Sequence, residues 1–169
     1  MSVEVGTVIP EVTLKYCVYD AEAAPNACGI PQPLNTHSVF KGKKVVLFAV
    51  PGAFTPTCSN THLPDFLSKY EDLKAKGVDL IVCLAANDAF VMNAWGKSQN
   101  VEDKILMVSD GNLELTKPLG LTQDSSKFTM GERTKRFALV IDDLKVTYVG
   151  IESQPGVGPS GVEAVLAAL

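Results

Sequence analysis

One cysteine of the chain stands where a reactive thiol is expected. Cys58 follows a turn-rich stretch, Pro51 to Thr57, which separates an apolar run from the next helical segment. A cysteine near the start of a helix lies close to unpaired backbone N–H groups and to the positive end of the helix dipole, and both favour thiolate over thiol. Most free cysteines are buried and inert, so position alone also allows a packing role. Cys58 is therefore a candidate nucleophile.

The spacing of the cysteines argues against two other kinds of site. The chain contains four of them, Cys17, Cys28, Cys58 and Cys83. No pair forms a C-x-x-C, which disfavours a thioredoxin-type dithiol and a zinc ribbon. Cys58 and His62 are four residues apart and would share a helix face, but His37 is the only other histidine. These are too few ligands, so we predict no metal site.

The residues around Cys58 form a recognisable motif. Pro51-x-x-x-Thr55-x-x-Cys58 is the peroxidatic motif of the peroxiredoxins, and the longer string from Pro51 to Ser59, PGAFTPTCS, resembles the type II, or peroxiredoxin-5, group. The resemblance covers nearly the whole chain. It continues through His62-Leu63-Pro64 and through residues 87–96, and it ends near residues 133–137.

The resemblance implies a role for each motif residue. The Cys58 thiolate would attack the terminal peroxide oxygen and become a sulfenic acid. The Thr55 hydroxyl would orient the peroxide. Pro51 would shield the sulfur from water. Arg136 matches the family's catalytic arginine, and its cationic donors would stabilise the thiolate and the leaving oxygen. Arg133 would support the site from further away.

Each of these residues also has a simpler interpretation. Thr55 would act only as a helix cap, and Pro51 only as a turn former. Arg136 and Arg133 would be solvated charges on the surface. His62 is expected to be a packed helix residue and not a proton shuttle. Pro64 should loosen the helical turn before it, because proline removes a backbone hydrogen bond.

A sulfenic acid needs a second thiol to return to the reduced state. The segment 156–169 contains no cysteine, so a resolving cysteine of that region is not expected. Cys28 lies in a polar, proline-rich loop that resembles the fungal branch of the group, which implies that it resolves Cys58 of a partner subunit. The alternative is a free loop thiol. Cys83, which resembles the second cysteine of plant type II enzymes, and Cys17 are expected to be strand residues.

The resemblance also implies a fold, partners and an activity. The fold is a thioredoxin fold with peroxiredoxin insertions, a central mixed β-sheet flanked by helices, and the protein would be a homodimer. Thioredoxin, glutaredoxin or glutathione would reduce it, and hydrogen peroxide or small alkyl hydroperoxides would be substrates, with no cofactor. Two other functions remain open: a redox sensor or chaperone that uses Cys58 as a switch, and a thiol–disulfide oxidoreductase.

The hydrophobic pattern predicts the elements that position these residues. Strands are expected at residues 12–18, 45–50, 78–85, 105–109, 137–141 and 146–151, the last two forming a hairpin around Asp142-Asp143. Helices are expected at 63–73, ended by Gly77, at 89–97, at 113–118, and after a capping box that starts at Ser160. Such alternation favours an α/β fold with a mixed sheet and helices on both faces.

Length and charge limit the remaining possibilities. The 169 residues are the size of one domain, and residues 1–169 are read as a single unit. The net charge of −4 does not favour nucleic-acid binding. No apolar run approaches the ~20 residues that span a membrane. The start of the chain lacks the features of a secretory signal, so we expect a cytoplasmic protein, with a peroxisome or another organelle as the alternative.

Overall fold

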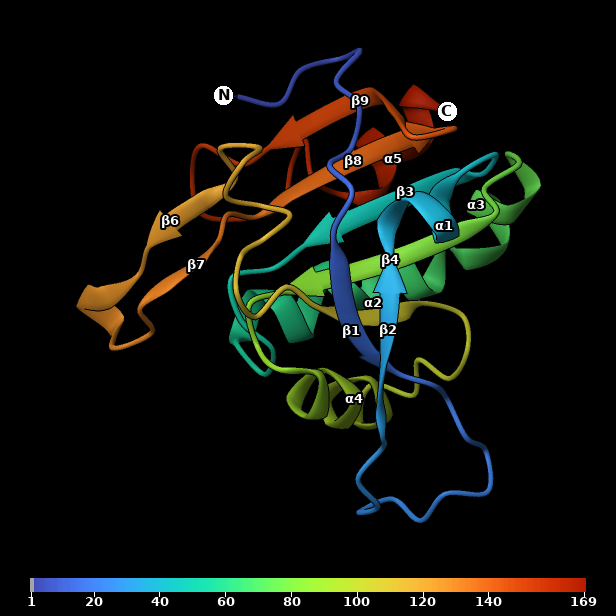
Figure 1. The fold of residues 1–169 in the computed structure, drawn as a ribbon, viewed down its shortest axis with the longest axis vertical. Helices are drawn as coiled ribbons and strands as arrows, with labels where there is room; N and C mark the ends of the chain where they lie inside the picture. Colours follow the sequence, from blue (N-terminus) through green and yellow to red (C-terminus); the bar gives the residue numbers. More distant parts are fainter. Residues whose placement is uncertain (1) are drawn as a thin grey trace.

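A seven-stranded mixed β-sheet forms the centre of the fold (Figure 1). This computed structural model describes residues 2–169. In spatial order the strands are β2 (Pro31–Asn35), β1 (Thr13–Cys17), β5 (Leu106–Ser109), β4 (Leu80–Ala85), β3 (Lys44–Ala49), β8 (Phe137–Asp142) and β9 (Lys145–Ile151). All six predicted strands are present. The predicted hairpin is β8–β9, although its turn is centred on Asp143 and Leu144, which both have positive φ angles.

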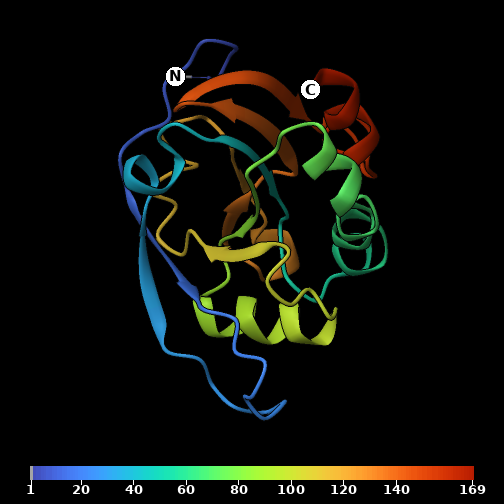
Figure 2. The same ribbon diagram turned by 90° about the vertical axis from the view of Figure 1, so that its right-hand side faces the viewer.

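The helices lie mostly on one face of the sheet. They are α1 (Thr36–Phe40), the π-helical turn η1 (Cys58–His62), α2 (Leu63–Ser68), α3 (Tyr70–Ala75), α4 (Ala89–Ser98) and α5 (Val162–Ala168). Strands β3, β4 and β5 are parallel neighbours, so the two right-handed crossovers between them place α2, α3 and α4 on the same face. Figure 2 shows α1, in blue-cyan, on the side opposite to α2, α3 and α5.

Apolar clusters fill both sides of the sheet. Along β3, Val46 and Phe48 point into the cluster beneath α2–α5, whereas Val45 and Leu47 point into the cluster on the α1 side. All are fully buried, which confirms the prediction of a strand covered on both faces. Phe48 stacks on Phe66 of α2 at a centroid distance of 4.0 Å. Burying side chains of this size stabilises the fold by about 2 kcal/mol each.

Several elements were not predicted. Strand β2 contains Pro31 and Pro33, and it forms because it is an edge strand that pairs only with β1. The short hairpin of β6 (Thr122–Asp124) and β7 (Glu132–Thr134), with the 3-10 turn η2 (Ser126–Phe128) between them, projects from one side of the molecule, at the left of Figure 1. Its three-residue strands carry no alternating hydrophobic pattern.

Two local predictions were wrong. Residues 113–118 form successive turns and not a helix, because Leu113 has a φ of 58° and the Asp110 carboxylate binds the amides of Leu115 and Thr116. The C-terminal helix exists, but its N-cap is Gly161. The Ser160 hydroxyl is therefore not part of a capping box and donates to the Glu152 carboxylate.

The turn that begins with Cys58 is wider than an α-helical turn. Pro64 has no N–H, and its ring would clash with the carbonyl of Asn60, four residues earlier. The N–H of Leu63 donates instead to the carbonyl of Cys58, five residues earlier, which makes residues 58–62 a π-helical turn. The loosened turn predicted from Pro64 is thus present, and single π turns often occur at functional sites.

Strand register brings three segments together at one end of the sheet. Ala49, the last residue of β3, pairs with Phe137, the first residue of β8, and Phe137 pairs with Ile151, the last residue of β9. The loop that follows β3 therefore lies beside Arg136, which precedes β8, and Arg136 in turn lies beside Glu152, which follows β9. The Glu152 amide donates to the Arg136 carbonyl at 3.0 Å.

Gly150 allows the segment before α5 to pack against β9. A Cβ atom at Gly150 would overlap the carbonyl oxygen of Pro159, whereas a Cβ at Gly158 would make ordinary contact with Glu152. We expect Gly150→Ala to lower the free energy of unfolding by about 1–3 kcal/mol because of overpacking. The control Gly158→Ala should change it little. Urea denaturation measures both, and equal midpoints for the two variants would contradict this packing.

Candidate active site

Cys58 lies at the carboxyl end of the central strand β3, near the beginning of a helix. Helical backbone starts at Pro56, so Cys58 stands in the first turn, where backbone N–H groups lack helical partners. The residue is fully buried within the cluster beneath α2–α5. The carboxyl ends of parallel strands are the usual place for ligand sites in α/β sheets. The fold thus places this sulfur at a typical functional position.

Arg136 is the side chain that contacts the sulfur. Its Nη2 donates to Cys58 Sγ at 3.1 Å, and its Nη1 donates to His62 Nδ1 at 2.9 Å. The residue is half-buried, and none of the ion pairs found within residues 2–169 includes it. The structure therefore brings Arg136 and Cys58 together. The guanidinium places its charge against a sulfur and an imidazole and not against a carboxylate.

His62 is buried, as expected for a packed helix residue, but it also orients Arg136. Its Nε2 lies 2.9 Å from the carbonyl oxygen of Ser160. A guanidinium only donates and a carbonyl only accepts, so Nδ1 must be bare and Nε2 must carry the proton. Burial, aided by the Arg136 charge, lowers the pKa of His62 to about 4, against the opposing effect of the Ser160 carbonyl. His62 is therefore neutral at pH 7.

Thr55 and Pro51 lie in the loop that leads to Cys58. The Thr55 hydroxyl donates to the carbonyl of Gly52 at 2.8 Å, so its proton is engaged and its lone pairs can accept from a ligand. The Thr55 carbonyl accepts from the amide of Ser59, which starts the helix. Both Thr55 and Pro51 are half-buried. The loop therefore carries a hydroxyl acceptor and an apolar ring shortly before Cys58 in the chain.

The small hairpin β6–β7 holds this loop from outside. The Thr134 hydroxyl donates to the Val50 carbonyl at 2.8 Å. Arg133 donates to the carbonyl of Met130 at 2.8 Å and, at a longer 3.4 Å, to that of Pro51. Arg133 is therefore tied to the loop backbone. The role of Thr134 was not predicted, because nothing in the sequence indicates which carbonyl a threonine will find.

Helix α4 contacts the helical turn that carries Cys58. The indole N–H of Trp95 donates to the Ser59 hydroxyl at 3.0 Å, directly beside Cys58. Asn87, just before α4, accepts the amide of Ala53 at 2.8 Å. Trp95 is the only tryptophan of the chain. Its fluorescence should therefore report on changes at Cys58.

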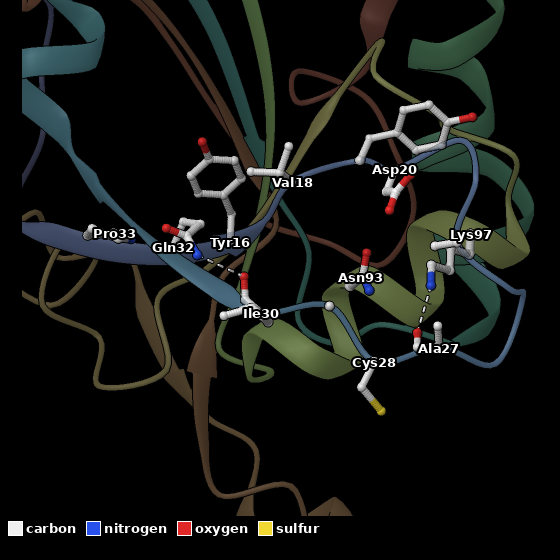
Figure 3. A pocket seen from close by; sticks show the side chains of 13 residues that line it. Tyr16, Val18, Asp20, Ala27, Cys28, Ile30, Gln32, Pro33, Asn93 and Lys97 are labelled. Carbon is white, nitrogen blue, oxygen red and sulfur yellow. Dashed lines mark hydrogen bonds between the residues drawn. The ribbon is translucent and has the colours of Figure 1, made fainter.

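The other cysteines differ in their surroundings. Cys83 lies in β4, and burial raises the pKa of its thiol well above the ordinary value. Cys17 ends β1 and is half-buried, with its pKa also raised by burial. Cys28 is exposed, in the loop between β1 and β2. That loop borders a groove of about 950 Å³ beside α4, and the Cys28 side chain points away from Tyr16 and Val18 (Figure 3).

Residues 2–169 contain no cluster of three or more histidine, cysteine, aspartate or glutamate side chains arranged to hold a metal ion. No helix within the same residues has the length and apolar character needed to cross a membrane.

A thiol held against an arginine at the end of a central strand defines a thiol-based redox enzyme on an α/β sheet. Comparison with known proteins agrees. The Redoxin family matches residues 4–166. A putative peroxiredoxin of Malassezia furfur is 45% identical over 150 residues, covering 88% of this chain and 90% of that protein. Peroxiredoxin-2C of Arabidopsis thaliana is 43% identical over 167 residues, covering 99% and 98%.

Solved structures give the same result. Reduced Prx3 of Vibrio vulnificus, in complex with hydrogen peroxide, superimposes with a TM-score of 0.87 at 44% identity and covers 98% of both chains. Peroxiredoxin 5 of Alvinella pompejana gives a TM-score of 0.82 at 37% identity, with coverage of 98% and 97%. The chain belongs to the redoxin family and is a type II peroxiredoxin, a thiol-dependent peroxidase. The predicted family, thioredoxin-type fold and activity are confirmed.

The depressed pKa of His62 makes stability depend on pH. Between its unfolded value of 6.5 and about 4, the unfolded chain binds a proton that the folded chain does not. The free energy of unfolding should therefore fall as pH drops through this window, by up to about 3 kcal/mol. Urea denaturation at pH 7, 5.5 and 4.5 measures this loss. His62→Gln should show a shallower pH dependence, and identical slopes would contradict the assignment.

Proposed function

We propose that Cys58 is the peroxidatic cysteine, on the strength of the 3.1 Å contact between Arg136 Nη2 and Cys58 Sγ. The guanidinium charge stabilises the thiolate, which attacks the terminal oxygen of a hydroperoxide. The O–O bond breaks, that oxygen joins the sulfur as a sulfenic acid, and the departing oxygen takes up a proton to become water or an alcohol. The same guanidinium stabilises the charge on the departing oxygen.

Thr55 and Pro51 fix how the peroxide enters. The Thr55 proton is engaged by the Gly52 carbonyl, so the hydroxyl oxygen accepts a hydrogen bond from the peroxide O–H. This arrangement aligns the O–O bond with the sulfur, and such alignment accounts for much of the rate of a displacement. In this proposal Pro51 shields the sulfur from water, and Arg133 holds the Pro51 backbone in place.

Burial of Cys58 is compatible with oxidation by a small peroxide but not with formation of a disulfide bond. A fully buried sulfur suits hydrogen peroxide and small alkyl hydroperoxides. A disulfide bond, by contrast, needs a second sulfur within about 2.05 Å. The turn 58–62 must therefore open after oxidation, and its π-helical geometry before Pro64 makes it a weak part of the helix.

Cys28 of a second subunit is the proposed resolving thiol. It is exposed, whereas Cys83 is buried and has a raised pKa. Attack of Cys28 on the sulfenic acid forms an intersubunit disulfide and releases water. Thioredoxin, glutaredoxin or glutathione then reduces this disulfide. The working unit is accordingly a homodimer. The proposed compartment is the cytoplasm, where such thiols are kept reduced, with a peroxisome or another organelle as the alternative.

Arg136→Lys tests the proposed role of the guanidinium. Lysine keeps the charge but loses the planar fork that spans Cys58 and His62. We expect kcat/KM for hydrogen peroxide to fall by about 100-fold, the effect of losing one well-placed donor to a developing anion. Peroxide consumption with dithiothreitol as reductant measures it. Cys58→Ser should abolish turnover and Cys17→Ser should retain it; a fully active Cys58→Ser would overturn the assignment.

Non-reducing electrophoresis tests the resolving thiol. One equivalent of hydrogen peroxide should convert the wild type into a covalent dimer, because Cys28 of one subunit pairs with Cys58 of the other. Cys28→Ser should stay monomeric on the gel, and Cys17→Ser should behave as the wild type. A covalent dimer that persists in Cys28→Ser would contradict the proposed role of Cys28.

A further inference from the structure

The hydrogen bonds that hold the reactive sulfur continue to a glutamate outside the motif. We propose that Glu152 is a positioning residue for Cys58: it fixes the carbonyl of Ser160, which sets the tautomer of His62, which in turn orients Arg136. The inference rests on the proposed function of Cys58. It concerns a residue that touches neither the sulfur nor the Arg136 guanidinium.

Glu152 closes the segment between β9 and α5. Its Oε1 accepts three hydrogen bonds, from the Gly158 amide at 2.6 Å, the Ser160 amide at 2.9 Å and the Ser160 hydroxyl at 2.6 Å. Burial alone would raise the pKa of Glu152, but these hydrogen bonds bring it below the ordinary value. The carboxylate is therefore charged at pH 7, and hydrogen bonds to a charged acceptor are the strong ones.

The fixed Ser160 carbonyl determines which nitrogen of His62 is protonated. It accepts from Nε2 at 2.9 Å, and this leaves Nδ1 free to accept from Arg136 Nη1. If that carbonyl moved away, the proton could lie on Nδ1, where it would face a guanidinium N–H. Arg136 would then lose an acceptor, and its Nη2 would no longer be held at the sulfur of Cys58.

The same segment is clamped on its other side. The Tyr148 hydroxyl donates to the carbonyl of Pro159 at 2.7 Å, and Gly150 leaves room for that carbonyl. The Glu152 amide donates to the Arg136 carbonyl at 3.0 Å. Glu152 thus holds the backbone of Arg136 with its amide. Its carboxylate holds the amide and the hydroxyl of Ser160, the residue whose carbonyl faces His62. A closed ring of contacts runs from Glu152 through Ser160, His62 and Arg136.

Glu152→Gln tests this role because it keeps the shape and removes the charge. Glu163→Gln is the matched control, since Glu163 is exposed on α5 and pairs with Lys69 on the surface. Stopped-flow fluorescence of Trp95 measures the rate at which hydrogen peroxide oxidises Cys58. Nitrogen NMR shifts measure the tautomer of His62, with His37 as internal reference. Thermal unfolding shows whether both variants stay folded.

We expect Glu152→Gln to slow oxidation of Cys58 by about tenfold, the effect of neutralising a charged acceptor. The Nε2–H population of His62 should fall, His37 should not change, and Glu163→Gln should match the wild type. An unchanged rate would overturn the proposal, as would a slower rate with an unchanged His62 tautomer. The tautomer is read without turnover. Failure of this proposal is therefore distinct from an active Cys58→Ser, which would refute the peroxidatic role itself.

Discussion

The site depends on where the charge of Arg136 is held. One half-buried guanidinium donates to Cys58 Sγ and to His62 Nδ1, and neither acceptor is a carboxylate. Removing a cation from water costs free energy unless the protein supplies acceptors with good geometry. Within residues 2–169 the sulfur is one of two side-chain acceptors of this guanidinium. The guanidinium charge therefore has few partners other than the sulfur, which supports the proposed role of Cys58.

The register between β3 and β8 determines where Arg136 lies. Antiparallel pairing of β3 with β8 puts the start of β8 beside the end of β3, so Arg136 meets the loop that carries Cys58. A slip of one residue would turn every β8 side chain to the opposite face and move Arg136 away from the sulfur. The buried alternation of β8, with Ala138 and Val140 on one side and Leu139 on the other, opposes such a slip. Core packing thereby keeps Arg136 beside the sulfur of Cys58.

Much of this structure could be predicted from local sequence. The buried strands and the β8–β9 hairpin follow from hydrophobic runs, and the motif around Cys58 identified the family. What could not be predicted depends on long-range contacts. Edge strand β2 contains prolines that argue against a strand until its position at the sheet edge is known. The sequence predicts only a packing role for His62, because Arg136 lies 74 residues further along the chain. It does not indicate that Glu152 binds Ser160, because that contact forms within the irregular segment between β9 and α5.

The histidine that links Glu152 to Arg136 is neutral, and its neutrality matters for the charge of Arg136. A carboxylate placed directly on the guanidinium would orient it equally well, but it would compete with the sulfur for the positive charge. Glu152 acts instead through the Ser160 carbonyl and an uncharged imidazole, whose pKa is lowered to about 4 by burial. Orientation is passed along this chain of hydrogen bonds while the negative charge stays away from the sulfur. The guanidinium is thereby fixed in place and its charge remains available to Cys58.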